Sequence, residues 1–202
     1  MELQQIKTGN DNISIITDKV IESIAKIKAF HLTQMNEELY KLHKKLLSTA
    51  KNKNKSYEVG MFWNLSDTDE CFVIYGTMNG IDMNKNEEVK KLVTYGPICS
   101  IAVLHNHPRN GLFSSRDISS FIEYNSIYLL TAVCNDGTIY MLRKEANFNP
   151  FLLREYYNQG IKKNRRKSLG NKPCYYGIKN VAKHAKEIGV TYRCSVRRKE
   201  MR

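Results

Sequence analysis

The sequence of 202 residues predicts an α/β fold, a three-layer domain in which a mixed β-sheet is flanked by helices. Two early segments carry apolar residues at helical spacing. Several later segments are short, apolar and rich in β-branched residues, a composition typical of strands. The predicted order is helices, hairpin, helix, strand, helix, hairpin. This alternation favours helices packed around a single sheet.

The N-terminal part is predicted to form two helices. Residues 17–30 form the first, with Thr17 as its N-terminal cap. Residues 33–51 form the second, because their leucines share one face and their Glu and Lys residues the opposite face. His31 and His43 fall within these patterns, and we expect both to be ordinary, partly exposed side chains.

The middle of the chain begins with a predicted hairpin. Residues 58–65 and 71–78 have strand composition, and the polar stretch 66–70 between them is typical of a turn. Residues 86–95 follow as a helix, which Gly96 and the next proline should end.

Four further elements complete the predicted domain. Residues 98–104 are apolar and predict a buried strand, and residues 115–124 predict a helix. Residues 127–134 and 138–144 predict a second hairpin, because the Asp-Gly pair between them favours a tight turn.

Most of the candidate functional residues lie where the predicted buried strand meets the following helix. Side chains at i and i+2 leave the same face of a strand, so His105 and His107 should point together. Pro108 then ends the strand pairing, because it has no N–H to donate. Ser114 is a predicted helix cap, with Asp117 in the first turn. Two imidazoles and a carboxylate that leave one position open are typical of catalytic zinc. The alternative is a polar loop followed by an ordinary capping box.

Glu58 is the candidate for general acid–base chemistry. A hydrolytic zinc site needs a group that takes a proton from water and returns it to the leaving group. Glu58 stands at the head of the otherwise apolar run 57–63, where a charge is unusual. The alternative is an exposed carboxylate at a strand end.

Together these residues resemble the motif of the JAB/MPN+ (JAMM) zinc metalloproteases, and most closely the bacterial RadC-like branch. That motif is a Glu on an early strand, then H-x-H-P, a short loop and S-x-x-D. The matching residues are Glu58, His105, His107, Ser114 and Asp117. A G-T-x-N-type segment also follows the Glu strand, here at 76–80. The resemblance covers about residues 56–145. The loop of six residues between His107 and Ser114 is one shorter than usual in the family.

The resemblance implies a cytidine-deaminase-like fold and a zinc-dependent peptidase or isopeptidase. One zinc ion per chain would be bound by His105, His107 and Asp117. Glu58 would activate the water, and Ser114 would donate a hydrogen bond to the tetrahedral oxyanion. The family cleaves peptide or isopeptide bonds at the C-terminus of ubiquitin-like proteins, so a peptide or ubiquitin-like protein is the implied substrate.

The chain divides into three predicted regions, and its charge lies in the last. N-terminal helices occupy residues 1–55, the zinc domain residues 56–148, and a basic C-terminal extension residues 149–202. Residues 151–202 hold 15 Lys and Arg against 3 Glu, whereas residues 1–150 are neutral overall. Such asymmetry indicates an acidic partner, either nucleic acid or an acidic protein. The alternative is a solvated tail, or one that packs on the enzyme domain.

A nucleic-acid-associated, RadC-like accessory protein of a repair or mobile-element system is therefore the alternative function. The densest basic run is 162–167, and nearby tyrosines are candidates for stacking on bases. These are Tyr156, Tyr157, Tyr175, Tyr176 and Tyr192. An intact Glu58 favours the hydrolase, because a purely structural zinc site needs no such group.

Composition narrows the remaining classes. There is no run of eighteen apolar residues and no signal-peptide pattern, so we expect a cytoplasmic protein without a membrane span. The 5 cysteines are scattered without a C-x-x-C pair, which suits a reducing compartment. Phosphate-binding glycine loops and the G-x-S-x-G motif of serine hydrolases are absent.

Overall fold

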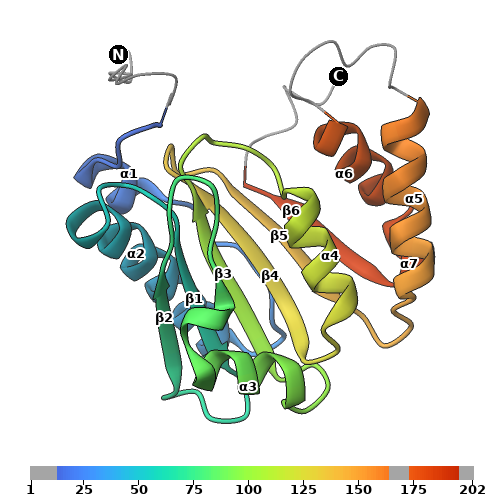
Figure 1. Ribbon diagram of the computed structural model, residues 1–202, viewed down its shortest axis with the longest axis horizontal. Coiled ribbons are helices and arrows are strands. Elements are labelled where there is room, and N and C mark those ends of the chain that lie inside the picture. Colours follow the sequence, from blue (N-terminus) through green and yellow to red (C-terminus); the bar gives the residue numbers. More distant parts are fainter. Residues whose placement is uncertain (1–12, 164–172, 196–202) are drawn as a thin grey trace.

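The computed structural model describes residues 13–163 and 173–195, which form a six-stranded mixed sheet with helices on both faces (Figure 1). The order across the sheet is β2-β1-β3-β4-β5-β6. The strands are β1 (Val59–Asn64), β2 (Cys71–Tyr75), β3 (Ile101–His107), β4 (Ile127–Cys134), β5 (Ile139–Lys144) and β6 (Val190–Cys194). The predicted α/β class with a mixed, helix-flanked sheet is confirmed.

Both predicted hairpins are present, since β1 pairs antiparallel with β2 and β4 with β5. Between them, β3 runs antiparallel to β1 and parallel to β4. The parallel pair needs a crossover, and α4 (Ser115–Glu123) supplies it. Gly137 takes the left-handed φ of 91° in the second hairpin turn, as its Asp-Gly sequence predicts.

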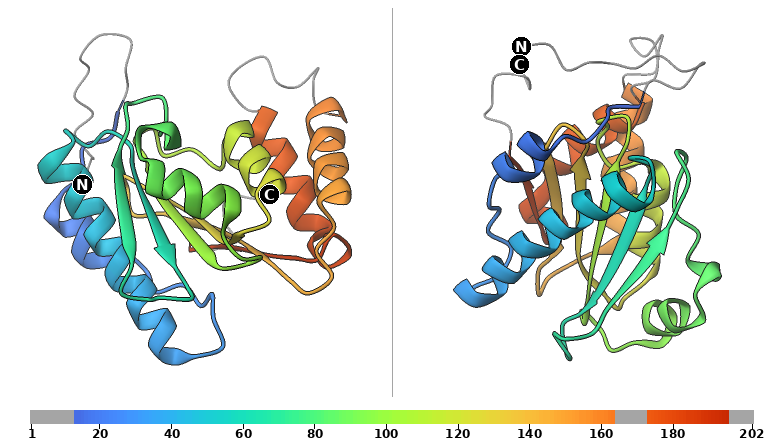
Figure 2. Two further views of the ribbon diagram at one scale, coloured as in Figure 1. Left: turned by 60° about the horizontal axis from the view of Figure 1, so that its bottom comes forward. Right: turned by 90° about the vertical axis from the view of Figure 1, so that its left-hand side faces the viewer.

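One face of the sheet is covered by α1 (Asp18–Ser23) and α2 (Thr33–Lys53) (Figure 2). The leucine face of α2 packs against the inward side chains of β1, β3 and β4. The predicted second helix is confirmed, but the expectation for His43 is wrong. Its side chain is fully buried and its Nε2 lies 3.0 Å from the Thr131 hydroxyl.

The predicted first helix is too long. Thr17 caps it as expected, accepting from the Val20 N–H, but the helix ends at Ser23. The next residue, Ile24, has φ −58° and ψ 143°, which is extended backbone of the polyproline type. Apolar residues three apart also share one side of such a chain, which has three residues per turn. The spacing of Ile24, Ile27 and Phe30, all buried, therefore fits an extended segment as well as a helix.

The opposite face carries the second core, which includes Phe62, Val103, Ile118, Phe121 and Leu130. Its covering elements are η1 (Met83–Lys85), α3 (Glu87–Tyr95), α4, α5 (Pro150–Lys163), α6 (Pro173–Lys183) and α7 (Ala185–Ile188). The predicted helices at 86–95 and 115–124 are confirmed to within a residue at each end.

The C-terminal region is joined to this domain throughout its described part. Strand β6 pairs antiparallel with β5 and completes the sheet. Leu153 and Tyr157 of α5 are buried in the second core. The expectation that Tyr157 stacks on bases is therefore wrong, because only 6% of this residue is exposed. Most of the basic run 162–167 lies outside the described residues, which resume at Pro173. Of the helices that are described, none combines the length and apolarity needed to cross a bilayer.

Candidate metal centre

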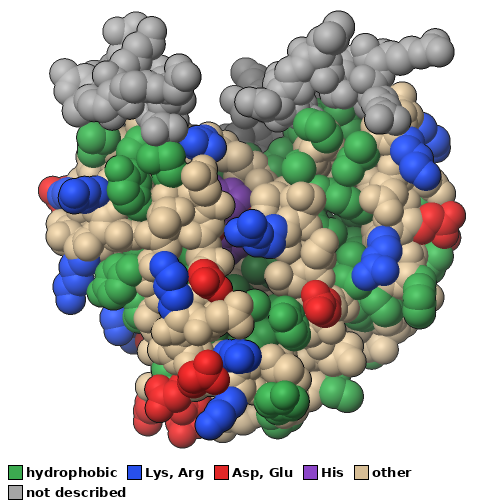
Figure 3. Space-filling view, viewed as in Figure 1, with side chains coloured by type: hydrophobic (Ala, Val, Ile, Leu, Met, Phe, Trp, Pro, Cys, Tyr) green, Lys and Arg blue, Asp and Glu red, His purple; other side chains and the backbone are tan. Residues whose placement is uncertain are grey.

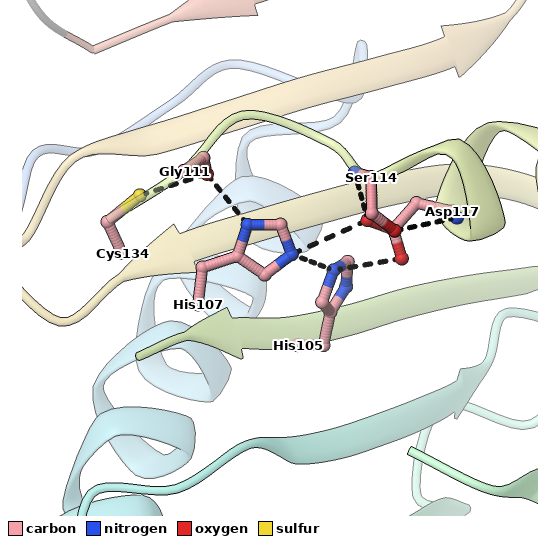
Figure 4. A network of polar contacts seen from close by, with 6 residues as sticks. All are labelled: His105, His107, Gly111, Ser114, Asp117 and Cys134. Atoms are coloured by element: carbon pink, nitrogen blue, oxygen red, sulfur yellow. Dashed lines mark hydrogen bonds and ion pairs between the residues drawn. The ribbon is translucent and has the colours of Figure 1, made fainter. Parts of the chain in front are cut away.

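The predicted site residues meet at one end of the sheet, on the face that α4 covers. Figure 4 shows four of them, His105, His107, Ser114 and Asp117. His105 and His107 are the third-last and last residues of β3, and both rings leave the same face as predicted. The N-terminus of α4 faces them, with Ser114 as its cap and Asp117 in its first turn. Glu58 directly precedes β1, and Gly60 of that strand lies opposite His105.

The two imidazoles and the Asp117 carboxylate converge closely. The Nε2 atoms of His105 and His107 lie 2.8 Å apart. Asp117 Oδ1 lies 3.4 Å from the His105 Nε2, and Asp117 Oδ2 lies 3.4 Å from the His107 Nε2. The three side chains expose only 3%, 12% and 16% of their surface, so little solvent screens them.

Backbone carbonyls orient both rings. His107 Nδ1 donates to the Gly111 carbonyl over 2.7 Å, and the Cys134 thiol donates to the same oxygen (Figure 4). His105 is hydrogen-bonded to the backbone of Thr131 on β4. A ring that donates from Nδ1 presents an unprotonated Nε2 when it is neutral. The short loop after His107 therefore supplies the carbonyl that a metal-binding imidazole needs.

The capping box of α4 fixes the carboxylate. Ser114 Oγ accepts from the Asp117 N–H, and Asp117 Oδ2 accepts from the Ser114 N–H over 2.6 Å. The Asp117 carboxylate thus closes the capping box and also faces the two imidazoles, so its role in the cap does not exclude a role as a metal ligand. Because the Ser114 oxygen accepts this bond, its own hydrogen remains available for a further acceptor.

Glu58 is buried beside the histidines rather than exposed at a strand end. One ligand atom from each of Glu58, His105 and His107 lies within 4.8 Å of the others, and this cluster could hold a metal ion. Burial raises the pKa of the Glu58 carboxyl above its usual value, against the opposing charges of the two imidazoles. Such a carboxyl can accept and release a proton nearer neutral pH.

The charges of His105 and Asp117 shift each other's pKa values. Burial opposes protonation of His105, but the charge and hydrogen bonding of Asp117 outweigh it and raise the pKa of the imidazole. Burial likewise favours neutral Asp117, yet His105 and His107 hold the pKa of its carboxyl well below the usual range. The Asp117 carboxylate is therefore ionised, and the pocket favours a positive charge beside it.

Two buried asparagines, both missed by the sequence analysis, bind the backbone next to Glu58. Asn106 accepts from the Val59 N–H over 2.7 Å and donates to Asn135 over 2.8 Å. Asn135 donates in turn to the carbonyls of Ser14 and Ser56. The residue between two metal-type histidines points to the opposite face of the strand, and that parity was the available signal.

A cavity of about 470 Å³ opens beside the cluster. Glu58, both histidines, Ser114 and Asp117 line one end of it. Figure 3 shows histidine side chains at the bottom of a hollow in the surface, with a Lys or Arg side chain next to them. Its size lies within the range of ligand-binding pockets, about 300–1,000 Å³.

No family model, curated protein or solved structure matches the chain significantly.

Proposed function

We propose that this protein is a zinc metallohydrolase of the JAMM type, which cleaves a peptide or isopeptide amide bond. One observation carries the proposal. Two imidazole Nε2 atoms, each turned inward by its ring's bond to a carbonyl, face each other at 2.8 Å, with an ionised carboxylate 3.4 Å from both. Such an arrangement of lone pairs and negative charge is stabilised by a cation between them.

The donor set fits zinc. Ligand atoms about 2.1 Å from a tetrahedral zinc lie about 3.4 Å from one another. Each imidazole Nε2 lies at that distance from one of the two Asp117 oxygens, whereas the imidazole–imidazole distance is shorter, so the rings would separate slightly around an ion. His105, His107 and Asp117 are therefore the proposed ligands, and Glu58 is left for proton transfer. The mixed, helix-flanked sheet is compatible with the JAMM, cytidine-deaminase-like fold.

Zinc bound there would polarise a substrate carbonyl and make a water acidic enough to attack it near neutral pH. Glu58, buried and next to the imidazoles, would accept a proton from the attacking water and deliver it to the leaving amine. Ser114, whose hydrogen is free of the cap bond, would donate to the oxyanion. His107 and His105 would stay oriented by their carbonyl partners throughout.

Metal analysis tests this proposal. The purified protein should carry about one zinc per chain, and His107→Ala or Asp117→Ala should each remove most of it. Asn79→Ala, which alters a residue of the cavity wall outside the proposed ligands, should leave the zinc content unchanged. Full zinc occupancy in both ligand variants would mean that the ligands are assigned wrongly.

The second candidate, a nucleic-acid-associated protein, is favoured by the charge of residues 151–202. In its described part, α6 and α7 carry Lys179, Lys183 and Lys186. Replacing the three with Gln should weaken retention of DNA or RNA and flatten its dependence on salt, because fewer counterions are released. Equal retention of the variant and the unchanged protein at low salt would exclude these lysines. Retention of neither would favour an acidic protein partner.

A further inference from the structure

The cavity beside the metal centre continues beyond the polar cluster into an apolar compartment. Its floor is the second core's side of the sheet, and its outer wall is the segment that follows β2. The floor consists of Phe62, Val103, Ile127 and Leu130, which are almost fully buried. Ile81 and Met83 form the wall and are partly buried.

Gly60 makes room for this wall. It lies on β1 between Glu58 and Phe62, where the pleat directs all three residues to the same face. A Cβ at this position would come within 2.7 Å of the Ile81 Cδ1. The glycine therefore lets Ile81 approach the sheet next to the catalytic carboxylate.

A positively charged side chain, that of Arg116, lies at the edge of the compartment. Arg116, exposed in the first turn of α4, lines the cavity one residue before Asp117. Its Nη1 lies close over Gly80, where a Cβ would be only 2.9 Å from it. Among residues 13–163 and 173–195, Arg116 makes no hydrogen bond or ion pair. Ile81, Met83 and Arg116 also line a second cavity, on the α3 side.

We propose that the substrate residue next to the scissile amide carries a bulky apolar side chain, which enters this compartment, and a nearby carboxylate, which pairs with Arg116. This inference rests on the proposed hydrolase and names its substrate class. A substrate with only glycine at the scissile bond would leave the apolar wall formed by Ile81 and Met83 in contact with water. An apolar side chain removes that surface from water, and the arginine gains a partner at the edge of the compartment.

Binding of small blocked amino acids tests the inference without any turnover. The probes are N-acetylphenylalanine, N-acetylglycine and the methylamide of each, titrated into the zinc-loaded protein by calorimetry. The phenylalanine compounds should bind about 10- to 100-fold more tightly than the glycine compounds, the value of one buried apolar side chain. The carboxylate should add up to about 5-fold over the methylamide, as expected of an exposed ion pair.

Two variants with matched controls locate the contacts. Arg116→Gln should abolish the preference for the carboxylate, and Arg154→Gln, on the exposed face of α5, should keep it. Ile81→Ser should weaken the phenylalanine compounds alone, whereas Ile98→Ser, which alters a residue 78% exposed, should not. N-acetylphenylalanyl-aspartic acid amide, whose carboxylate is on a side chain, separates the two carboxylate sources. Tighter binding of this probe than of N-acetylphenylalanine assigns Arg116 to an acidic side chain, and the reverse assigns it to a chain end.

The results separate this inference from the proposed function. Equal affinity for phenylalanine and glycine compounds on the unchanged protein would overturn the inference, even if the protein hydrolyses amides. A carboxylate preference that survives in Arg116→Gln would overturn the role of the arginine. A clear apolar preference in a protein that never cleaves an amide would support the compartment and count against the hydrolase.

Discussion

The buried imidazole of His43 should make the protein lose stability in mild acid. His43 is fully buried on the α2 face of the sheet, and burial lowers its pKa to about 3. Its Nε2 has the Thr131 hydroxyl as partner, whereas its Nδ1 has no hydrogen-bond partner within the described chain. The folded protein therefore holds this ring neutral, while the unfolded chain protonates it near pH 6.5.

Proton linkage gives the direction and the size of this change in stability. Between the unfolded pKa of about 6.5 and the folded pKa of about 3, the unfolded state binds the extra proton, so stability falls as pH falls. The loss from this one group between pH 7 and pH 5 is about 2 kcal/mol. Above pH 7 the contribution of His43 is complete and constant.

Urea unfolding of the metal-free protein at several pH values measures this loss. The variant for comparison is His43→Leu with Thr131→Val, because removing both polar partners leaves neither unpaired in the core. From pH 7 to pH 5, the unfolding free energy of the unchanged protein should fall by about 2 kcal/mol relative to that of the double variant. Parallel pH profiles of the unchanged and double-variant proteins would refute a neutral, buried His43.

Two other perturbations follow from the same structure. Ser114→Ala removes the N-terminal cap of α4, so the free energy of unfolding, measured with denaturant, should fall by about 1 kcal/mol. Turnover should also fall about 100-fold, as expected for the loss of one oxyanion donor. A loss of stability without a loss of turnover would mean that Ser114 is only a cap. Ending the chain at residue 149 deletes β6 and the buried Leu153, so the remainder should show a lower melting temperature and exposed apolar surface by dye binding; an unchanged melting curve would show that the sheet does not need its sixth strand.

Local signals carried most of the fold prediction. Both hairpins, the helices around Asn86 and Ser114, and the alternation of layers came from patterns within about fifteen residues. The error in the 24–30 segment arose because an apolar spacing of three is shared by helices and extended chains. A tertiary contact decides between the two conformations here. The Asn36 side chain accepts hydrogen bonds from the N–H groups of Ala29 and Phe30, and these bonds replace those of a helix.

The sequence predicted which residues meet at the candidate site, but not the residues that support them. His105, His107 and Asp117 are identified by strand parity and helix capping, which are local rules, and the structure brings them together. The Asn106–Asn135 pair and the His43–Thr131 contact join residues 29 and 88 positions apart. Strand parity places Asn106 on the face opposite the histidines, but no local pattern identifies its partner or that of His43. The joining of β6 to β5 is likewise a long-range pairing, hidden by the strongly basic composition around it.

Glu58→Gln is the most direct test of the proposed hydrolase, because the proposal assigns Glu58 to proton transfer and not to the metal. Zinc content and turnover of one peptide or isopeptide substrate should be measured on the same preparation. Zinc should stay at the level of the unchanged protein, while turnover should fall about 100- to 10,000-fold, which is about 3 to 5.5 kcal/mol of transition-state stabilisation. Cleavage at the unchanged rate by Glu58→Gln would contradict the account, whatever metal the protein holds.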